Sequence, residues 1–327
     1  MTALPRLSVV VPTRGRAQLL ARCLDALAAQ TLEPAAFEVL VVDDGLSDVT
    51  AAQVQARAAK LPPGHLRYLR PAHGTGPAVA RNTGWRAALG AVIAFTDDDT
   101  VAQPDWLAEG EQALLSHPGW VGLAGRVAVP HPPGQLPTDH ARMTQGLETA
   151  MFVTANAFVR RTALARVQGF DERFQRPWRE DADLQFRLAA LGPVRRCEQA
   201  VVWHPVRPER WGVSLRQQRN VFFDALLYRK HPRLYRACLR RVPPWDYYGI
   251  VALALAAPAL ALAAPVAAAV AVAAAGGLVL RFAAQRLRHT SRKPGHVLEM
   301  LATSALIPFL SVYWRLRGAL HFRVWFL

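Results

Sequence analysis

Short apolar runs that alternate with segments of helical spacing constrain this chain more than any other feature. Four such runs lie at residues 7–11, 37–42, 66–69 and 91–95. They are mostly valine, leucine and isoleucine and end in polar or turn residues, which is typical of strands buried on both faces. Helical patterns follow them at 17–30, 49–60, 77–89 and 104–116. The alternation predicts a doubly wound α/β sheet that is mostly parallel.

The middle of the chain continues the pattern with one interruption. Further strands are expected at 121–129 and 152–161, and another that ends at His204. Residues 130–137 contain four prolines, which fix the backbone and remove hydrogen-bond donors. We therefore expect a mobile loop there.

Acidic residues follow two of the predicted strands. Asp43 and Asp44 come after the second run, and Asp97, Asp98 and Asp99 come after the fourth. The carboxyl ends of parallel strands meet at one edge of a sheet, so these acids should converge. Like charges repel, and hard oxygen ligands suit Mg²⁺ or Mn²⁺ carrying a diphosphate. The alternative is that both clusters are solvated acidic turns.

Several common classes of site are absent from the sequence. No GxGxxG follows the first predicted strand, and no GxxxxGK[ST] is present, which excludes the dinucleotide fingerprint and the P-loop. The cysteines at 23, 197 and 238 have no metal-binding spacing, and this predicts a reducing compartment. The N-terminal residues lack the long apolar region of a secretory signal.

Four sequence blocks resemble the successive motifs of family 2 glycosyltransferases with the GT-A fold. They are SVVVPTRGR at 8–16, VVDDGLSD at 41–48, ARNTG at 80–84 and FTDDD at 95–99. Each block alone is weak, but four in this order within about 100 residues are specific. The resemblance implies a donor that is a nucleotide-diphosphate sugar, linked to UDP or GDP.

The resemblance also implies roles for particular residues. The implied donor-binding residues are Pro12, Thr13, Arg14, Asp43, Asp44, Arg81, Asp97, Asp98, Asn156 and Glu180. Asp99 is the implied metal ligand of the D-x-D motif, with His204 as a further ligand. Structural alternatives stay open: Arg81 on a helix surface, Arg14 and Arg16 as solvated loop charges, Asn156 as a turn amide, and His204 as a hydrogen-bonding group.

A second acidic cluster lies at the start of a predicted helix. Leu184, Leu188 and Leu191 have helical spacing, which puts the acids at 180–183 at the helix N-terminus. That position favours ionised carboxylates, and a general base must be ionised before it accepts a proton. The segment resembles the E-D-x-D-L motif of the same family, which implies that Asp181 is the base. The alternative is that these acids only cap the helix.

One motif departs from the family pattern. Processive relatives carry Q-x-x-R-W, whereas residues 216–220 here are RQQRN. The first and last positions differ. This departure puts polymer synthesis in doubt and favours transfer of a single sugar.

The C-terminal third contains apolar stretches long enough to enter a bilayer. Residues 246–280 have no basic residue, and 296–314 form a second apolar stretch. A membrane span needs about 20 residues. Basic residues on both sides of 246–280 predict that this run crosses twice or re-enters, and 296–314 spans once or lies in the interface. A buried alanine-rich helix pair is the alternative.

The membrane prediction explains the positive net charge and indicates the class of acceptor. Much of the +15 charge flanks the apolar stretches, where anionic lipid attracts it, so nucleic acid is not expected as a partner. We expect a catalytic domain at 1–240 and a membrane-associated helical region at 241–327. The domain would face the cytoplasm at the cell inner membrane and use a lipid-linked or glycan acceptor in cell-envelope polysaccharide synthesis.

The predicted reaction is an inverting, Mg²⁺- or Mn²⁺-assisted sugar transfer. Two alternatives belong to other classes. A sugar-phosphate nucleotidyltransferase would share the sheet but release pyrophosphate. A membrane scaffold would bind nucleotide sugar without turnover.

Overall fold

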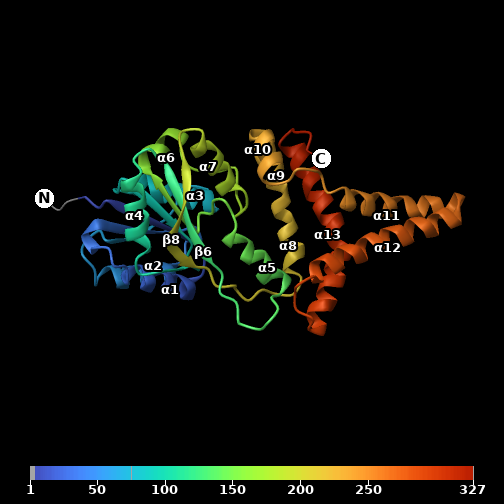
Figure 1. Cartoon of the computed structure of the whole chain (residues 1–327), viewed down its shortest axis with the longest axis horizontal. Coiled ribbons are helices and arrows are strands. Elements are labelled where there is room, and N and C mark those ends of the chain that lie inside the picture. Colours follow the sequence, from blue (N-terminus) through green and yellow to red (C-terminus); the bar gives the residue numbers. More distant parts are fainter. Residues whose placement is uncertain (1–3, 75, 327) are drawn as a thin grey trace. The chain divides into compact units, whose positions relative to one another are not determined.

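The computed structural model describes residues 4–74 and 76–326, and it divides into two compact units. The first unit is Met1–Pro130 with Gln145–Val206, and the second is His131–Thr144 with Arg207–Leu327 (Figure 1). The chain therefore leaves the first unit after Pro130 and returns at Gln145. The boundary expected at residue 240 lies inside the second unit.

The first unit contains a mixed sheet of eight strands in the order β3-β2-β1-β4-β7-β6-β8-β5. The strands are β1 (Leu7–Thr13), β2 (Phe37–Asp43), β3 (Leu66–Leu69), β4 (Val92–Thr96), β5 (Val101–Ala102), β6 (Gly122–Ala128), β7 (Asn156–Arg160) and β8 (Val194–Trp203). β1 pairs in parallel with both β2 and β4, and β2 with β3. β7 is antiparallel to β4 and to β6. The predicted α/β class with a mostly parallel sheet is confirmed, and β7 and β5 are its antiparallel strands.

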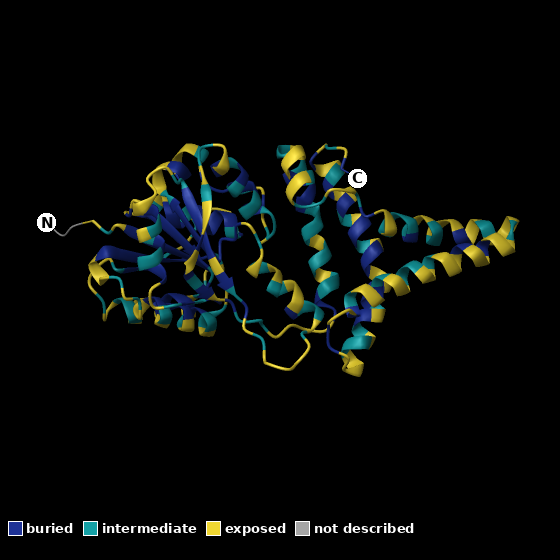
Figure 2. Cartoon of the chain, in the orientation of Figure 1, coloured by how far each residue is buried: buried dark blue, intermediate teal, exposed yellow. Residues whose placement is uncertain are grey.

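Helices cover both faces of this sheet (Figure 1). The helices α1 (Ala17–Ala28), α2 (Asp48–Ala58) and α4 (Trp106–Ser116) share one apolar core, and α3 (Pro77–Ala87), α6 (Arg161–Val167) and α7 (Glu180–Ala189) share the other. Within β1, Val9 and Val11 belong to the first core and Val10 to the second. Side chains alternate across a strand, so a continuous valine run supplies both faces. Figure 2 shows the strands as the buried centre of the unit.

The sequence located the first four strands within two residues of their observed ends, but it misjudged β7. We expected a strand from 152, whereas β7 begins at Asn156. The Asn156 N–H donates to the Val153 carbonyl at 3.1 Å, so a turn precedes the strand. The short strand β5 and the helix α6 were not predicted.

The second unit is helical. Its helices are α5 (Asp139–Gln145), whose last residue belongs to the first unit, α8 (Val213–Gln217), α9 (Phe222–Lys230), α10 (Pro232–Cys238), α11 (Trp245–Ala263), α12 (Pro265–Leu287) and α13 (Pro294–His321). Short 3₁₀ turns lie at Pro34–Ala36 and Gly146–Glu148 in the first unit, and at Gln218–Val221 in the second. The loop predicted at 130–137 is present, and α5 after it was not predicted.

Three of these helices, α11, α12 and α13, are long and apolar enough to cross a membrane. The 19 residues of α11 rise about 28 Å, close to the roughly 30 Å hydrocarbon core of a bilayer. The chain breaks between α11 and α12 at Pro265, as expected, whereas Pro258 lies inside α11. Only 6% of the apolar window of α11 is buried within the protein, so lipid is the solvent that suits it.

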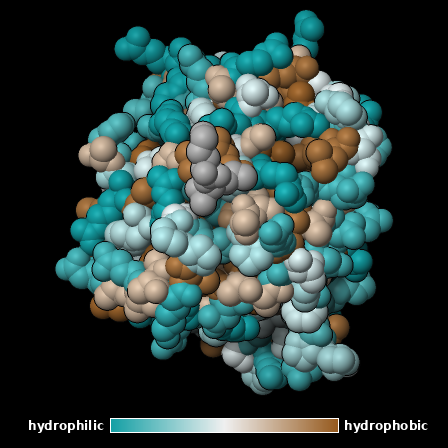
Figure 3. Space-filling model, turned by 90° about the vertical axis from the view of Figure 1, so that its left-hand side faces the viewer, coloured by the Kyte–Doolittle hydropathy of each residue, from teal (hydrophilic) through white to brown (hydrophobic). Residues whose placement is uncertain are grey.

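Surface polarity differs between parts of the chain. The face of the sheet unit in Figure 3 is mostly hydrophilic, with scattered apolar side chains. In contrast, Leu262 of α11 and Val266 of α12 are 92% and 77% exposed. Three apolar C-terminal helices thus fit a membrane anchor.

Gly110 tests the packing of α4 on the sheet. A Cβ at Gly110 would lie 2.3 Å from the ring of Phe158 in β7. We expect Gly110→Ala to lower the free energy of unfolding by about 1–3 kcal/mol, because the core has no room for the methyl group. Gly119→Ala is the matched control, since a Cβ there meets nothing within 4 Å. Thermal unfolding of both variants measures the effect, and equal stability would contradict the packing.

Candidate active site

Two aspartates and a histidine meet just beyond the end of β4. Asp97 and Asp99 follow the strand, and His204 follows β8. Each offers one ligand atom, and these three atoms lie within 4.8 Å of one another. Two carboxylates and an imidazole suit a divalent cation such as Mg²⁺ or Mn²⁺. The residues therefore fit a divalent metal, and the predicted metal ligands Asp99 and His204 lie together.

A buried arginine connects this cluster to the second group of acids. The side chain of Arg81, from α3, is 4% exposed. Its Nη2 lies 2.8 Å from Asp97 Oδ1, and its Nη1 lies 3.1 Å from Glu180 Oε1. Arg81 therefore does not lie on a helix surface. It holds the end of β4 and the start of α7 together.

The environment of these acids shifts their pKa values in opposite directions. Burial alone would raise the pKa of Asp97, but the positive charge of Arg81, followed by the electrostatic interaction with His204, outweighs it, and the pKa lies below its ordinary value. Burial is also the largest influence on Glu180. Together with repulsion from Asp181, it raises the pKa of Glu180 to about 8. A neutral acid thus lies next to an ionised one.

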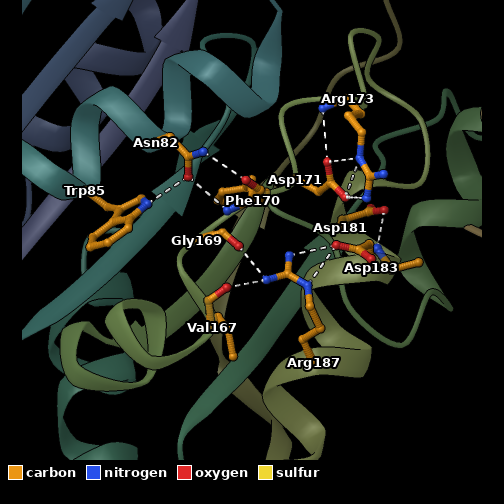
Figure 4. Close-up of polar contacts among 11 residues, drawn as sticks. Asn82, Trp85, Val167, Gly169, Phe170, Asp171, Arg173, Asp181, Asp183 and Arg187 are labelled. Atoms are coloured by element: carbon orange, nitrogen blue, oxygen red, sulfur yellow. Dashed lines mark hydrogen bonds and ion pairs between the residues drawn. The ribbon is translucent and has the colours of Figure 1, made fainter. Parts of the chain in front are cut away.

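Asp181 lies at the first turn of α7, beside Asp183 (Figure 4). Asp183 is fully buried and pairs with Arg187 at 2.7 Å, so it has a structural role. Asp181 is half-buried, and its Oδ1 accepts the Ala182 N–H at 2.7 Å. Burial raises the pKa of Asp181 above its ordinary value, although this N–H and the charge of Arg179 oppose the shift. A carboxylate with a raised pKa is the better proton acceptor.

The loop that leads to α7 is held by Asn82 of α3. In Figure 4, the Asn82 amide exchanges hydrogen bonds with the backbone of Phe170, at 2.9 Å in both directions. Trp85 Nε1 also donates to Asn82 Oδ1, at 2.8 Å. Asn82 follows Arg81 directly, so a single turn of α3 fixes both the acids and the loop. Sequence reasoning quoted Asn82 within a motif but gave it no role.

Asp98 has partners other than the residues of the Asp97–Asp99–His204 cluster. It is fully buried and accepts the Thr13 hydroxyl at 2.6 Å and Arg16 Nε at 3.0 Å. Burial raises the pKa of Asp98 to about 6. The alternative that Arg16 is only a solvated loop charge is excluded by its pair with Asp98. The topology alone could have predicted that Arg16 lies near Asp98, because β1 and β4 are neighbours and Arg16 follows β1.

The two predicted acids at the end of β2, Asp43 and Asp44, have different hydrogen-bond partners. Asp43 accepts the N–H groups of Gly45 and Ser47, both at 2.8 Å, and therefore shapes the turn. Asp44 accepts the Gly76 N–H at 2.9 Å, and Arg14 Nη1 lies 3.4 Å from its Oδ2. Pro12 and Thr13 occupy the neighbouring end of β1, paired with Val42 and Asp43.

Asn156 is bonded entirely within the protein. Its Oδ1 accepts Trp106 Nε1 at 2.8 Å, and its Nδ2 donates to the carbonyls of Arg126 and Ala200, both at 2.9 Å. The residue is fully buried. These bonds join β7 to β6, β8 and α4. A donor-binding role for Asn156 stays a prediction.

Comparison with known sequences agrees with this geometry. The profile of the family described as "Glycosyl transferase family 2" matches residues 8–167. Glycosyltransferase AglE of Haloferax volcanii is 29% identical over 232 residues, which cover 67% of this chain and 73% of that protein. Validoxylamine A glucosyltransferase of Streptomyces hygroscopicus subsp. limoneus is 30% identical over 278 residues, covering 70% of this chain. The match spans 58% of that enzyme, less than two thirds of its length.

Solved structures share the fold. The mannosyltransferase PcManGT from Pyrobaculum calidifontis, in complex with GDP-Man and Mn²⁺, has a TM-score of 0.62 at 20% identity, covering 96% of this chain and 88% of its own. S. aureus TarS 1–349 in complex with UDP has a TM-score of 0.51 at 17% identity, covering 95% and 92%. At these identities the likeness supports the GT-A fold.

The raised pKa of Glu180 makes a stability prediction. Between its ordinary value of 4.5 and about 8, the folded chain keeps a proton on Glu180 that the unfolded chain has lost. Raising the pH through this window therefore destabilises the fold. Glu180→Gln lacks this titration. Its melting temperature relative to wild type should rise between pH 5 and pH 8, by an amount equivalent to at most about 1.4 kcal/mol for each pH unit. A difference that stays constant with pH would contradict the assignment.

Proposed function

The chain contains a family 2 glycosyltransferase domain, and we propose that it transfers a sugar from a nucleotide-diphosphate sugar to a hydroxyl group with inversion at the anomeric carbon. The observation that carries the proposal is the Arg81 bridge, which joins the D-x-D strand end to the helix that bears Asp181. Donor-binding acids and a separate base are the two parts that an inverting transfer needs.

The donor-binding part lies at the ends of β1, β2 and β4. We assign the nucleotide base to Asp44, Pro12 and Thr13, with Arg14 at the exposed rim. Backbone and carboxylate groups there match the hydrogen-bonding edges of a nucleobase. PcManGT binds GDP-Man and TarS binds UDP, and either class of donor suits this chain.

Asp97, Asp99 and His204 would hold a divalent cation next to the diphosphate. When bound, Mg²⁺ or Mn²⁺ stabilises the negative charge of a departing nucleoside diphosphate. Arg81 adds a fixed positive charge beside Asp97. Its burial keeps that charge in a medium of low dielectric constant, where it acts more strongly than in water.

Asp181 would accept the proton of the acceptor hydroxyl while the oxygen attacks the anomeric carbon. Its neighbour Glu180 contacts Arg81 at 3.1 Å, and Asp183 is paired with Arg187. Among the described residues Asp181 forms no ion pair, so of the three acids at the start of α7 it is the one left to take a proton. Positioned bases of this kind contribute about 10²–10⁴-fold to rate.

The three apolar helices suggest membrane association, and this favours a lipid-linked or membrane-proximal acceptor. We propose that the sheet unit works on the cytoplasmic face of the inner membrane. Transfer of a single sugar is favoured over polymer synthesis, because 216–220 lacks the Q-x-x-R-W pattern.

Purified protein incubated with a panel of UDP- and GDP-sugars, with and without Mn²⁺, tests the reaction. Release of pyrophosphate would favour a nucleotidyltransferase instead, and no turnover of any donor would favour a scaffold.

Asp181→Asn tests the base. The amide keeps the size of the side chain but cannot accept the proton, so we expect turnover to fall by about 10²–10⁴-fold. Donor binding, measured by calorimetry, should stay within a factor of about two. Asp183→Asn is the structural comparison and should mainly lower thermal stability. Wild-type turnover in Asp181→Asn would remove the base assignment.

Asp99→Ala tests the metal site. Loss of this carboxylate should abolish Mn²⁺-dependent transfer and weaken Mn²⁺ binding measured directly by electron paramagnetic resonance. Asp105→Ala, the acid that precedes α4, is the control. Full activity of wild-type protein after removal of divalent cations by a chelator would contradict a metal-assisted reaction.

A further inference from the structure

The middle aspartate of the D-x-D segment and the arginine after β1 form a pair whose purpose the proposed reaction does not explain. Asp98 is fully buried, whereas the side chain of Arg16 is 33% exposed. Arg16 contacts both carboxylate oxygens: Nε donates to Oδ2 at 3.0 Å, and Nη2 forms an ion pair with Oδ1 at 2.7 Å. Among the described residues no hydrogen bond reaches Oδ1, so the ion pair compensates its burial. The Thr13 hydroxyl fixes the same oxygen, Oδ2, at 2.6 Å.

The remaining nitrogen of Arg16 faces the acid cluster. Its Nη1 lies 3.8 Å from Oδ2 of Asp99, the carboxylate assigned to the metal. At 3.8 Å the two groups form an ion pair, but the distance is too long for a hydrogen bond. A small rotation would form that hydrogen bond, and the guanidinium would then occupy a carboxylate oxygen that a cation needs.

Distance makes the pair with Asp98 the stronger of the two contacts, because both carboxylates are buried and Arg16 lies 2.7 Å from Asp98 but 3.8 Å from Asp99. A buried carboxylate is costly unless it is paired and hydrogen-bonded, so Asp98 retains its arginine. Asp99, in contrast, has His204 Nε2 at 3.6 Å as another partner. The Asp98 carboxylate thus fixes how far Arg16 can approach Asp99.

We propose that Asp98 is a positioning residue that holds Arg16 away from Asp99 and so keeps the divalent-cation site open. This inference rests on the proposed metal-assisted function and gives Asp98 a different role from the donor-binding one expected from the sequence. The three consecutive acids then have two functions. Asp97 and Asp99 face the metal and donor, and Asp98 anchors a competing cation.

A double-mutant cycle in Mn²⁺ binding tests the proposal. The variants are Asp98→Asn, Arg16→Gln and the two combined, in the full chain, with Mn²⁺ alone as the probe and electron paramagnetic resonance of free Mn²⁺ as the readout. Asp98→Asn releases Arg16 toward Asp99, so Mn²⁺ should bind more weakly, on the order of tenfold. Arg16→Gln should bind Mn²⁺ at least as tightly as wild type. In the double variant the competitor is gone, and affinity should return to within about twofold of wild type.

The Mn²⁺ affinities of these variants distinguish a positioning role for Asp98 from a purely structural role. If Asp98 and Arg16 only support the fold, the double variant should bind Mn²⁺ as weakly as Asp98→Asn or more weakly, and this would overturn the proposal. Unchanged Mn²⁺ affinity in Asp98→Asn would also overturn it. Arg22→Gln, which removes an exposed arginine from α1, is the control and should leave Mn²⁺ binding unchanged. Absence of Mn²⁺ binding by wild type is a separate result, and it would overturn the proposed metal site together with this inference.

Discussion

The proposed chemistry depends on one buried guanidinium. Arg81 contacts Asp97 at the end of β4 and Glu180 at the start of α7, which are 83 residues apart in the sequence (180 − 97). A buried charge is tolerated only when it is paired, so Arg81 and the two acids require one another. Removing Asp97 would leave the Arg81 charge without its ionised partner, and removing Glu180 would take away a hydrogen-bond acceptor of the same guanidinium. The pairing therefore fixes the end of β4 relative to the start of α7, where Asp181 lies.

The same edge of the sheet contains a second arginine used in another way. Arg16 is partly exposed and pairs with Asp98, whereas Arg81 is buried and pairs with two acids from different elements. Four acids are thus packed near two arginines and a histidine, and the balance of charge decides which carboxylates stay ionised. Burial raises the pKa of Asp98 and Glu180, and nearby positive charge lowers that of Asp97. This edge of the sheet therefore contains one acid that ionises readily, Asp97, and two that hold a proton more readily, Asp98 and Glu180.

Much of the sheet and the identity of the acids were predictable, because both are local patterns. Apolar runs gave the strands, and the acids follow directly at their ends. The partners of those acids were harder to predict, since Arg16 contacts Asp98 from 82 positions away and Arg81 contacts Glu180 from 99 positions away. No local periodicity records such contacts, and only the topology, with β1 beside β4, could have placed Arg16 near Asp98. The antiparallel strand β7 was placed too early for a related reason, because the turn before it is as apolar as the strand. Helix α5 was not predicted, because it is short and follows a proline-rich loop.

The central claim is that a base on α7 and a cation site at the end of β4 act from opposite sides of one anomeric carbon. The anomeric configuration of the first product tests this geometry most directly. Proton NMR of the product, recorded before any spontaneous mutarotation or hydrolysis, compares it with the configuration of the nucleotide-sugar donor. The account predicts inversion in every product molecule. Retention of the donor configuration would contradict it, because a single base that activates the acceptor produces only inversion.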